Sequence, residues 1–281
     1  MTGIVLPLDP IIVQIGPVIL RWYGLMIGLA VVAGVYVGAR EAQRRGIPMD
    51  DAINMCTWAV PVGFVFARLF HVIDSLPYYM KDPIKIVMIN EGGMAIYGGL
   101  IGGVGAGVVY AALHNLPVGK LADASAPAVV LGQAIGRIGC FFNGDHQGIV
   151  ATLPWDNRSY FSFATQYTNA NTLVPDFGVP RHPTQVYEGL FDLVLFGIVW
   201  ALRKRIHVDG VLFWVYASLY SLGRFWISFL RLDSEFLFGL KEAQVVSLVT
   251  FMIGVPVILY LVGRYQRTAT APSPHIEAAA Q

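Results

Sequence analysis

The chain has 281 residues, of which 56% are hydrophobic and only 13% are charged, whereas a typical soluble domain is about 25% charged. Its 19 basic and 18 acidic residues are too few to give a globule of this size a water-facing surface, which excludes a soluble enzyme and a disordered scaffold. A net charge of +1 provides no basic surface for nucleic acid. We therefore expect an integral membrane protein surrounded by lipid.

Seven apolar stretches are long enough to cross a bilayer as helices. The predicted fold class is an all-α membrane protein with about seven transmembrane helices, forming one membrane domain over residues 1–267. The tail at 268–281, rich in Ala and Pro, is expected to be disordered. The seven spans are predicted near residues 18–39, 53–74, 93–114, 121–142, 184–203, 210–230 and 243–263.

The connection between the fourth and fifth spans, residues 143–183, differs from the other connections. It is polar, contains several aromatic residues and is long for a loop without structure of its own. We expect it to fold as a small cap on one end of the helices.

The Lys and Arg residues beside the spans predict the orientation, because cytoplasmic loops carry an excess of them. Nine lie on the side of the first, third and fifth loops and the C-terminus, including the clusters at 44–45 and 203–205, against five on the other side. The N-terminus and the 143–183 cap are therefore predicted to be extracytoplasmic, and the C-terminus cytoplasmic.

Five further arginines lie within or at the edge of apolar spans, where a cation costs roughly 2.5–3.5 kcal/mol at the bilayer centre. Arg21 and Arg231 are near predicted span ends and could instead extend to the headgroups. Arg68, Arg137 and Arg224 have more apolar surroundings and are predicted to face a polar cavity. Because the planar guanidinium suits a phosphate group, several of them together would bind an anionic lipid headgroup.

Acidic, glycine and metal-ligand patterns are less specific. Glu188 and Asp192 lie one helical turn apart in the fifth span, as in many ion-paired or proton-conducting helices. Glycines at 99, 103 and 107 form a strip that favours close helix packing. The six histidines are dispersed and the two cysteines lie far apart, so no metal or cofactor is expected.

The most informative stretch, residues 136–148, reads GRIGCFFNGDHQG. A buried Arg here precedes a glycine-punctuated turn that holds Asn, Asp and His. Irregular polar backbone at membrane depth is tolerated only where it lines protein or water. The residues alone thus indicate an arginine-lined polar cavity beneath the cap.

This stretch resembles the characteristic motif of the prolipoprotein diacylglyceryl transferase family, which is matched at Gly136, Arg137, Gly139, Phe141, Asn143 and Gly148. Four further family-like motifs follow the same order along the chain, over about 210 residues in all. They are RWYGL at 21–25, GGMAIYGGLIG at 92–102, RHPTQVYE at 181–188, and GRF at 223–225 with RLD at 231–233.

The resemblance implies a monomeric, multi-pass enzyme of the bacterial inner membrane that needs no cofactor. Its substrates would be phosphatidylglycerol and a prolipoprotein signal peptide with a lipobox cysteine, and its products a thioether and glycerol 1-phosphate. The implied catalytic residues are Arg137, Arg224 and Tyr97, and the implied substrate-binding residues are Tyr23, Asn143, Asp145, Gly148, His182, Glu188 and Arg231.

The chain departs from the family pattern at four positions. Tyr97 replaces a His proposed as general base, and tyrosine, with a pKa near 10, is a poor base at neutral pH. The thiol could ionise in the field of the arginines, or His182 or His146 could accept its proton. Cys140 and Asp145 replace an Asn and a Glu, and Ser228 stands where a Glu often pairs with the Arg one turn earlier.

Two rival functions use the same cavity. One is a transporter, although the two halves show no inverted repeat of the kind common in transporters. The other is a lipid-binding family member without catalytic activity.

Overall fold

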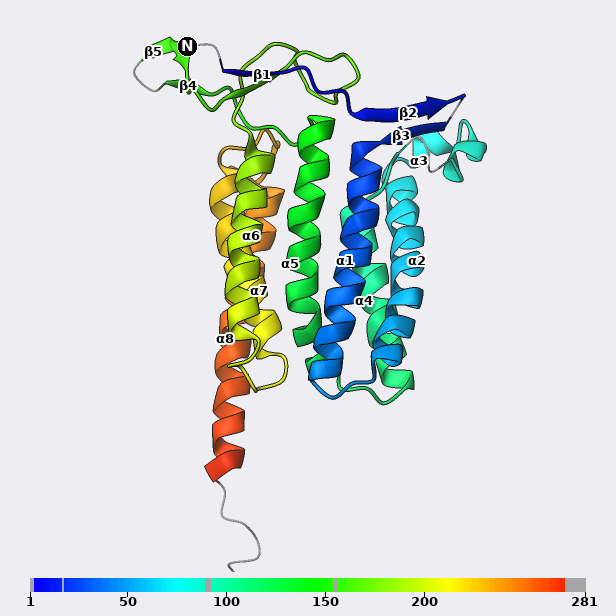
Figure 1. Cartoon of the computed structure of the whole chain (residues 1–281), viewed down its shortest axis with the longest axis vertical. Helices are drawn as coiled ribbons and strands as arrows, with labels where there is room; N and C mark the ends of the chain where they lie inside the picture. The colour runs from blue at the N-terminus through cyan, green and yellow to red at the C-terminus, as the bar shows by residue number, and fades with distance from the viewer. Residues whose placement is uncertain (1–2, 17, 89–91, 154–155, 271–281) are drawn as a thin grey trace, which may run out of the picture.

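The computed structural model describes residues 3–16, 18–88, 92–153 and 156–270. It is mainly helical, with short strands at the ends of the helices (Figure 1). The helices are α1 (Trp22–Arg44), α2 (Met49–Asp74), α3 (Leu76–Tyr79), η1 (Pro83–Ile86), α4 (Ile96–Leu113), α5 (Val118–Asn143), α6 (Thr184–Leu202), α7 (Val211–Ser228) and α8 (Glu242–Thr270). The strands are β1 (Ile4–Leu6), β2 (Ile11–Ile15), β3 (Val18–Arg21), β4 (Thr152–Leu153), β5 (Asp156–Tyr160), β6 (Thr165–Tyr167), β7 (Glu235–Leu237) and β8 (Leu240–Lys241).

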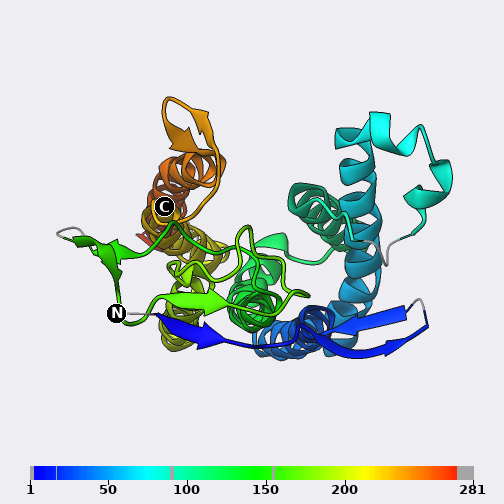
Figure 2. The same cartoon turned by 90° about the horizontal axis from the view of Figure 1, so that it is seen from above.

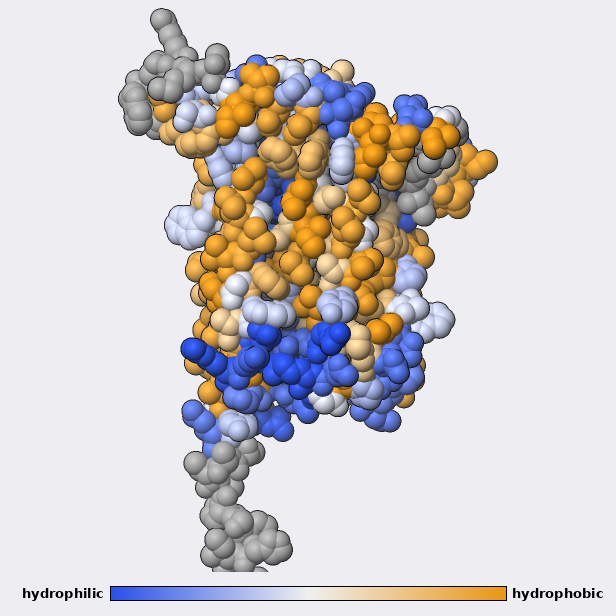
Figure 3. Space-filling view, viewed as in Figure 1, coloured by the Kyte–Doolittle hydropathy of each residue, from blue (hydrophilic) through white to orange (hydrophobic). Residues whose placement is uncertain are grey.

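Within the described residues, six helices are long and apolar enough to cross a membrane: α1, α2, α4, α5, α6 and α8. Their side faces form a broad hydrophobic band, with hydrophilic residues gathered at the lower end of the view (Figure 3). The prediction of an all-α membrane protein is therefore confirmed at this level. Helix α7 coincides with the predicted sixth span but is not among these six helices, and it carries Arg224 and several polar and aromatic residues.

The first and last predicted spans have different limits in the structure. Residues 18–21, expected to begin the first helix, form β3 instead and pair antiparallel with β2. The β-branched and aliphatic run there satisfies its backbone in a hairpin, so α1 begins at Trp22. At the other end α8 continues to Thr270, beyond the predicted start of the tail at 268, and the remainder of that tail lies outside the described residues.

Helix α5 is central to the packing. It contacts α1 and α6 extensively and α7 and α4 to a smaller extent, whereas α2 pairs with α4, and α7 with α8 (Figure 2). The glycine strip of α4 faces α2, where a Cβ added to Gly63 would lie 3.2 Å from the carbonyl oxygen of Gly99 and 3.4 Å from the Cα of Gly103. The close-packing interpretation of this strip therefore holds for the contact between α2 and α4.

The 143–183 segment folds over the end of the helices where α5 ends and α6 begins (Figure 1). Its strand β6 pairs in parallel with β1 near the N-terminus. The buried Tyr167 hydroxyl donates to the carbonyl of Phe141 (2.5 Å) and accepts from the Gln185 amide (3.2 Å). Burial raises the pKa of Tyr167, so this hydroxyl stays protonated and joins the cap to α5 as a donor and to α6 as an acceptor.

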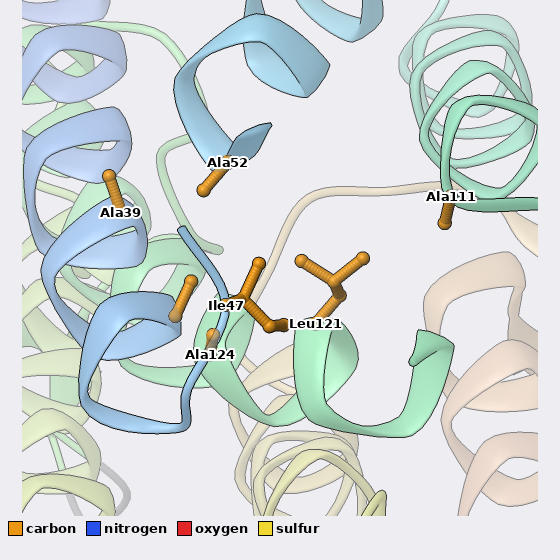
Figure 4. Close-up of a cluster of buried hydrophobic side chains, with 7 residues drawn as sticks. Ala39, Ile47, Ala52, Ala111, Leu121 and Ala124 are labelled. Carbon is orange, nitrogen blue, oxygen red and sulfur yellow. The ribbon is translucent and has the colours of Figure 1, made fainter. Parts of the chain in front are cut away.

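The opposite end is held by a small apolar core and an ionic network. The core gathers buried residues of α1, α2, α4 and α5 with Ile47 (Figure 4). Beside it, the buried Glu41 forms ion pairs with Arg44, Arg45 and Arg203, and Arg45 also pairs with Asp123 (2.9 Å). Apolar packing and ion pairs thus hold this end together, whereas the cap end carries the predicted site. The labelled core residues are Ala39, Ile47, Ala52, Ala111, Leu121 and Ala124.

Candidate functional site

One carboxylate lies at the centre of the predicted site. Glu188, one turn into α6 and only 3% exposed, forms ion pairs with Arg137 of α5 and Arg224 of α7. Arg231, in the turn after α7, donates from Nη1 to Glu188 Oε1 at 3.0 Å. Three helices and a loop thus bring three arginines to one carboxylate.

The three arginines differ in how much of each remains available. Arg231 is 4% exposed, and Asp233 accepts hydrogen bonds from its Nε (2.7 Å) and Nη2 (3.3 Å). Burial opposes ionisation of Asp233, but the hydrogen bonds and charge of Arg231 hold its pKa below the usual value. The side chains of Arg137 and Arg224 are 18% and 17% exposed, so these two retain surface that a ligand can contact.

Ser228 does not pair with the guanidinium of Arg224. It is fully buried, and its hydroxyl donates to the carbonyl of Arg224 at 2.7 Å. The expected carboxylate partner of Arg224 is therefore supplied by α6 through Glu188 instead of by the next turn of α7. Asp192, one turn further along α6, is 1% exposed, and neither of its carboxylate oxygens accepts a hydrogen bond.

The turn after α5 brings three predicted residues together. The Asn143 amide donates to Asp145 Oδ2 at 3.1 Å, and Gly144 ends the helix with a φ of 77°. The Gly148 N–H donates to the carbonyl of His182 at 2.8 Å. A Cβ at Gly148 would lie 2.8 Å from that of His182, so only glycine lets this turn approach α6 so closely.

The two predicted tyrosines come from the first turns of different helices. The backbone of Tyr23 lies against Gly139, where an added Cβ would be 3.2 Å from the Tyr23 Cα; its hydroxyl is electrostatically coupled to Cys140, Asp145 and Arg137. Tyr97, 40% exposed at the start of α4, is coupled to Arg224.

The hydroxyl of Tyr97 also interacts with Glu242, the first residue of α8. The sequence did not single out Glu242, because an acidic residue at a helix start has an ordinary explanation in the helix dipole.

The two histidines proposed as thiol bases have different surroundings. His182 packs among Phe161, Phe163 and Tyr187, with Nδ1 3.2 Å from the Tyr187 hydroxyl, and burial lowers its pKa. The more exposed His146 places Nδ1 3.2 Å from Asp145 Oδ1. Only His146 therefore lies among the acidic and amide groups of the site.

Arg68 and Arg21 do not belong to this cluster. The Arg68 guanidinium donates to backbone carbonyls of the segment that connects α2 and α4 and lies over the Tyr79 ring. The prediction that Arg68 faces a polar cavity with Arg137 and Arg224 is wrong, because its guanidinium nitrogens donate to the backbone of that segment instead. Arg21 donates to the carbonyl of Asn171 at 3.2 Å. The acceptors of Arg68 are Lys85, Ile86, Met88, Gly92 and Gly93.

The fold also assembles a group of metal-ligand types that the sequence pattern did not indicate. The Cys140 sulfur, a carboxylate oxygen of Asp145 and a ring nitrogen of His146 all lie within 4.8 Å of one another. These residues share one turn at the end of α5, beside Arg137.

An apolar cavity of about 290 Å³ lies along α6 and α7. Phe191, Gly223 and Trp226 are among its lining residues. Two of its lining residues, Gly223 and Trp226, flank Arg224 in the sequence, which places one side of the cavity near the arginine cluster.

Comparisons with known proteins identify a family and close relatives. Residues 10–260 match the family model described as prolipoprotein diacylglyceryl transferase. A phosphatidylglycerol–prolipoprotein diacylglyceryl transferase of Bacillus cereus (strain G9842) is 39% identical over 267 residues, covering 92% of this chain and 94% of the relative. One of the same name from Bacillus cytotoxicus is 36% identical over 285 residues, covering 99% of both chains.

Proposed function

This chain belongs to the prolipoprotein diacylglyceryl transferase family, and we propose that it transfers the diacylglyceryl group of phosphatidylglycerol to the lipobox cysteine of a prolipoprotein. The thiolate forms a bond to the glycerol carbon of the lipid as the bond from that carbon to the phosphate oxygen breaks. The products are a thioether and glycerol 1-phosphate. The convergence of Arg137, Arg224 and Arg231 on Glu188 is the observation that carries this assignment to the site.

Arg137 and Arg224 form the phosphate clamp in this proposal. Both are partly exposed and both are held by Glu188, so their guanidinium groups are positioned before lipid binds. Charge-assisted, bidentate hydrogen bonds to phosphate are strong, and they strengthen as negative charge develops on the departing phosphate ester. Arg231, saturated by Glu188 and Asp233, braces Glu188.

Thiol ionisation uses the same positive field. A free cysteine has a pKa near 8.5, and adjacent cations favour its thiolate. Tyr97, coupled to Arg224 and Glu242, would orient the thiol, and His146 is the histidine best placed to accept a proton. Tyr23, Asn143, Asp145 and Gly148 would shape the headgroup pocket, and His182 would hold the turn at Gly148 through its carbonyl.

The reaction would take place at the outer side of the bacterial inner membrane. The chain would be a monomer of the bacterial inner membrane with seven spans, α7 being the seventh. The N-terminus and the 143–183 cap would be extracytoplasmic, where prolipoproteins present their lipobox, and the C-terminus cytoplasmic. One acyl chain would lie in the apolar cavity along α6 and α7.

The direct test uses purified protein with phosphatidylglycerol and a lipobox peptide. Glycerol phosphate should appear only with the cysteine-containing peptide, and a peptide with Ser in place of that cysteine is the control. Arg137→Ala should abolish transfer, and Arg137→Lys should restore little, because a point charge does not reproduce a bidentate fork. Absence of product with the intact peptide would contradict the function, and near-normal Arg137→Lys activity would contradict the clamp.

A further inference from the structure

The turn after α5 holds a second set of chemical groups, distinct in kind from the arginine cluster. Cys140 is buried in the last turn of the helix, Asp145 is intermediate in exposure, and His146 is exposed. Thiolate, carboxylate and imidazole are the three ligand types that Zn²⁺ binds in proteins. They come from within seven consecutive residues of the chain, so no distant element has to move to bring them together.

The distances suit a tetrahedral ion. Zinc ligands lie about 2.0–2.3 Å from the metal, which places neighbouring ligand atoms roughly 3.3–3.7 Å apart. His146 Nδ1 and Asp145 Oδ1 are separated by 3.2 Å, and all three ligand atoms are within 4.8 Å. The imidazole of His146 is 42% exposed, and any separation longer than about 3.7 Å among the three ligand atoms would have to close on coordination.

Unsatisfied polar atoms at the same place provide an independent indication of a ligand. Asn143 is only 4% exposed, and its amide faces Asp145 through the hydrogen bond from Nδ2, yet its Oδ1 accepts no hydrogen bond. Asp145 Oδ1 is likewise buried and, although His146 Nδ1 lies 3.2 Å away, accepts no hydrogen bond of good geometry. Buried acceptors without partners are costly, and a cation with its bound water would satisfy both.

From this arrangement we infer that Cys140, Asp145 and His146 form a binding site for Zn²⁺ or a similar borderline-soft divalent cation, with the fourth position open to water. The Cys140 thiol gives up its proton on coordination. The bound ion lies at the end of α5, beside Arg137. Because it coordinates Asp145, that side chain is no longer available to the headgroup pocket, and zinc therefore inhibits transfer. The inhibition, unlike the metal site itself, rests on the proposed function.

Metal binding is tested on the full-length protein in detergent, using Co²⁺ as a spectroscopic probe and Zn²⁺ in competition with a chelator. The wild type should show a thiolate-to-cobalt charge-transfer band that zinc abolishes. Cys140→Ser should lose the band, and His146→Ala should weaken zinc binding by more than the roughly 10- to 100-fold cost of an outer-shell partner. Cys56→Ser, which removes the other cysteine, is the matched control and should behave as wild type.

Transfer assays with zinc test the metal site and the proposed function separately. Zinc should inhibit transfer by the wild type, EDTA should reverse the inhibition, and Cys140→Ser should retain basal transfer in the presence of zinc. A wild type without the cobalt band, or a band that persists in Cys140→Ser, overturns the site. Zinc binding without inhibition overturns the coupling. A protein that binds zinc and never transfers lipid contradicts the proposed function and leaves the metal site standing.

Discussion

At the scale of single residues, Glu188 organises the site. It is the shared partner of Arg137, Arg224 and Arg231, and it replaces the carboxylate that Ser228 lacks. Removing one member of a buried ionic cluster leaves the other charges uncompensated, which is more harmful than removing the whole cluster. Glu188 thus links the stability of the cap end to its chemistry.

Glu188→Gln should abolish transfer and destabilise the protein by about 3–5 kcal/mol, because three guanidinium groups lose their common anion. Glu188→Asp keeps the charge on a shorter side chain, so its transfer activity and stability should lie between those of the wild type and of Glu188→Gln. Thermal unfolding in detergent and glycerol phosphate release measure these effects. Glu235→Gln, at an exposed position of β7, is the control; a Glu188→Gln protein as stable as that control would refute the role.

His182 should make stability depend on pH. Burial lowers its pKa in the folded state, so its contribution is present above the ordinary histidine pKa of about 6.5. It is lost as pH falls through the lower folded value. The melting temperature should therefore fall on acidification from neutral pH, and His182→Gln should reduce that fall. Equal pH dependence in both proteins would show that His182 is not the titrating group.

At the scale of elements, connecting segments position the helices of the site. The turn after α5 reaches α6 only because residue 148 is glycine, and the segment before α4 is held by Arg68. That segment leads directly to Tyr97 at the start of α4, so we expect Arg68 to influence the position of Tyr97. A basic residue inside an apolar span can therefore serve backbone carbonyls instead of a substrate.

Arg68→Lys should loosen the segment between α2 and α4, because an ammonium group cannot reproduce five planar donors. We expect the free energy of unfolding to fall by about 1.5–3 kcal/mol, the value of one hydrogen bond to a charged group. Limited proteolysis should cleave this segment faster, and transfer should decrease. Lys81→Gln, at an exposed position of the same segment, is the control; an unchanged cleavage rate in Arg68→Lys would contradict this account.

At the scale of the whole molecule, the two ends of the helices have different compositions. One end holds the ionic network of Glu41 and Asp123 with the small apolar core. The other holds the strands and the cap (Figure 1), together with the arginine cluster around Glu188. This polarity matches the distribution of Lys and Arg along the sequence and supports the proposed orientation.

The orientation can be tested by cysteine labelling in a background in which both native cysteines are replaced by Ser. Ser162→Cys, exposed in the cap, should react with a membrane-impermeant maleimide in intact spheroplasts. Lys204→Cys, exposed in the loop after α6, should react only after permeabilisation, because the positive-inside rule places that loop in the cytoplasm. The reverse labelling pattern would contradict the orientation.

Much of the fold could be predicted from the sequence because its causes are local. A run of about 20 apolar residues predicts a spanning helix wherever it occurs, and α2, α4, α5, α6 and α7 begin and end within four residues of prediction. Helix α1 begins four residues after its predicted start, because residues 18–21 pair in the β2–β3 hairpin, whose sequence is as apolar as a span. The family was predictable for a related reason: its motifs are short, ordered segments of the sequence, and the comparisons confirm the family.

Which charges act together was decided only by the tertiary structure. Arg137, Glu188 and Arg224 are separated by 51 and 36 residues in the sequence, and no local pattern states that one carboxylate serves both arginines. Arg68 looked equivalent to them in composition, yet packing assigns it to a loop. The sparse charges of this chain thus identified a membrane protein by themselves. Their roles depended on which helix faces meet, because an ion pair forms only where folding brings opposite charges within a few ångströms in a low-dielectric interior.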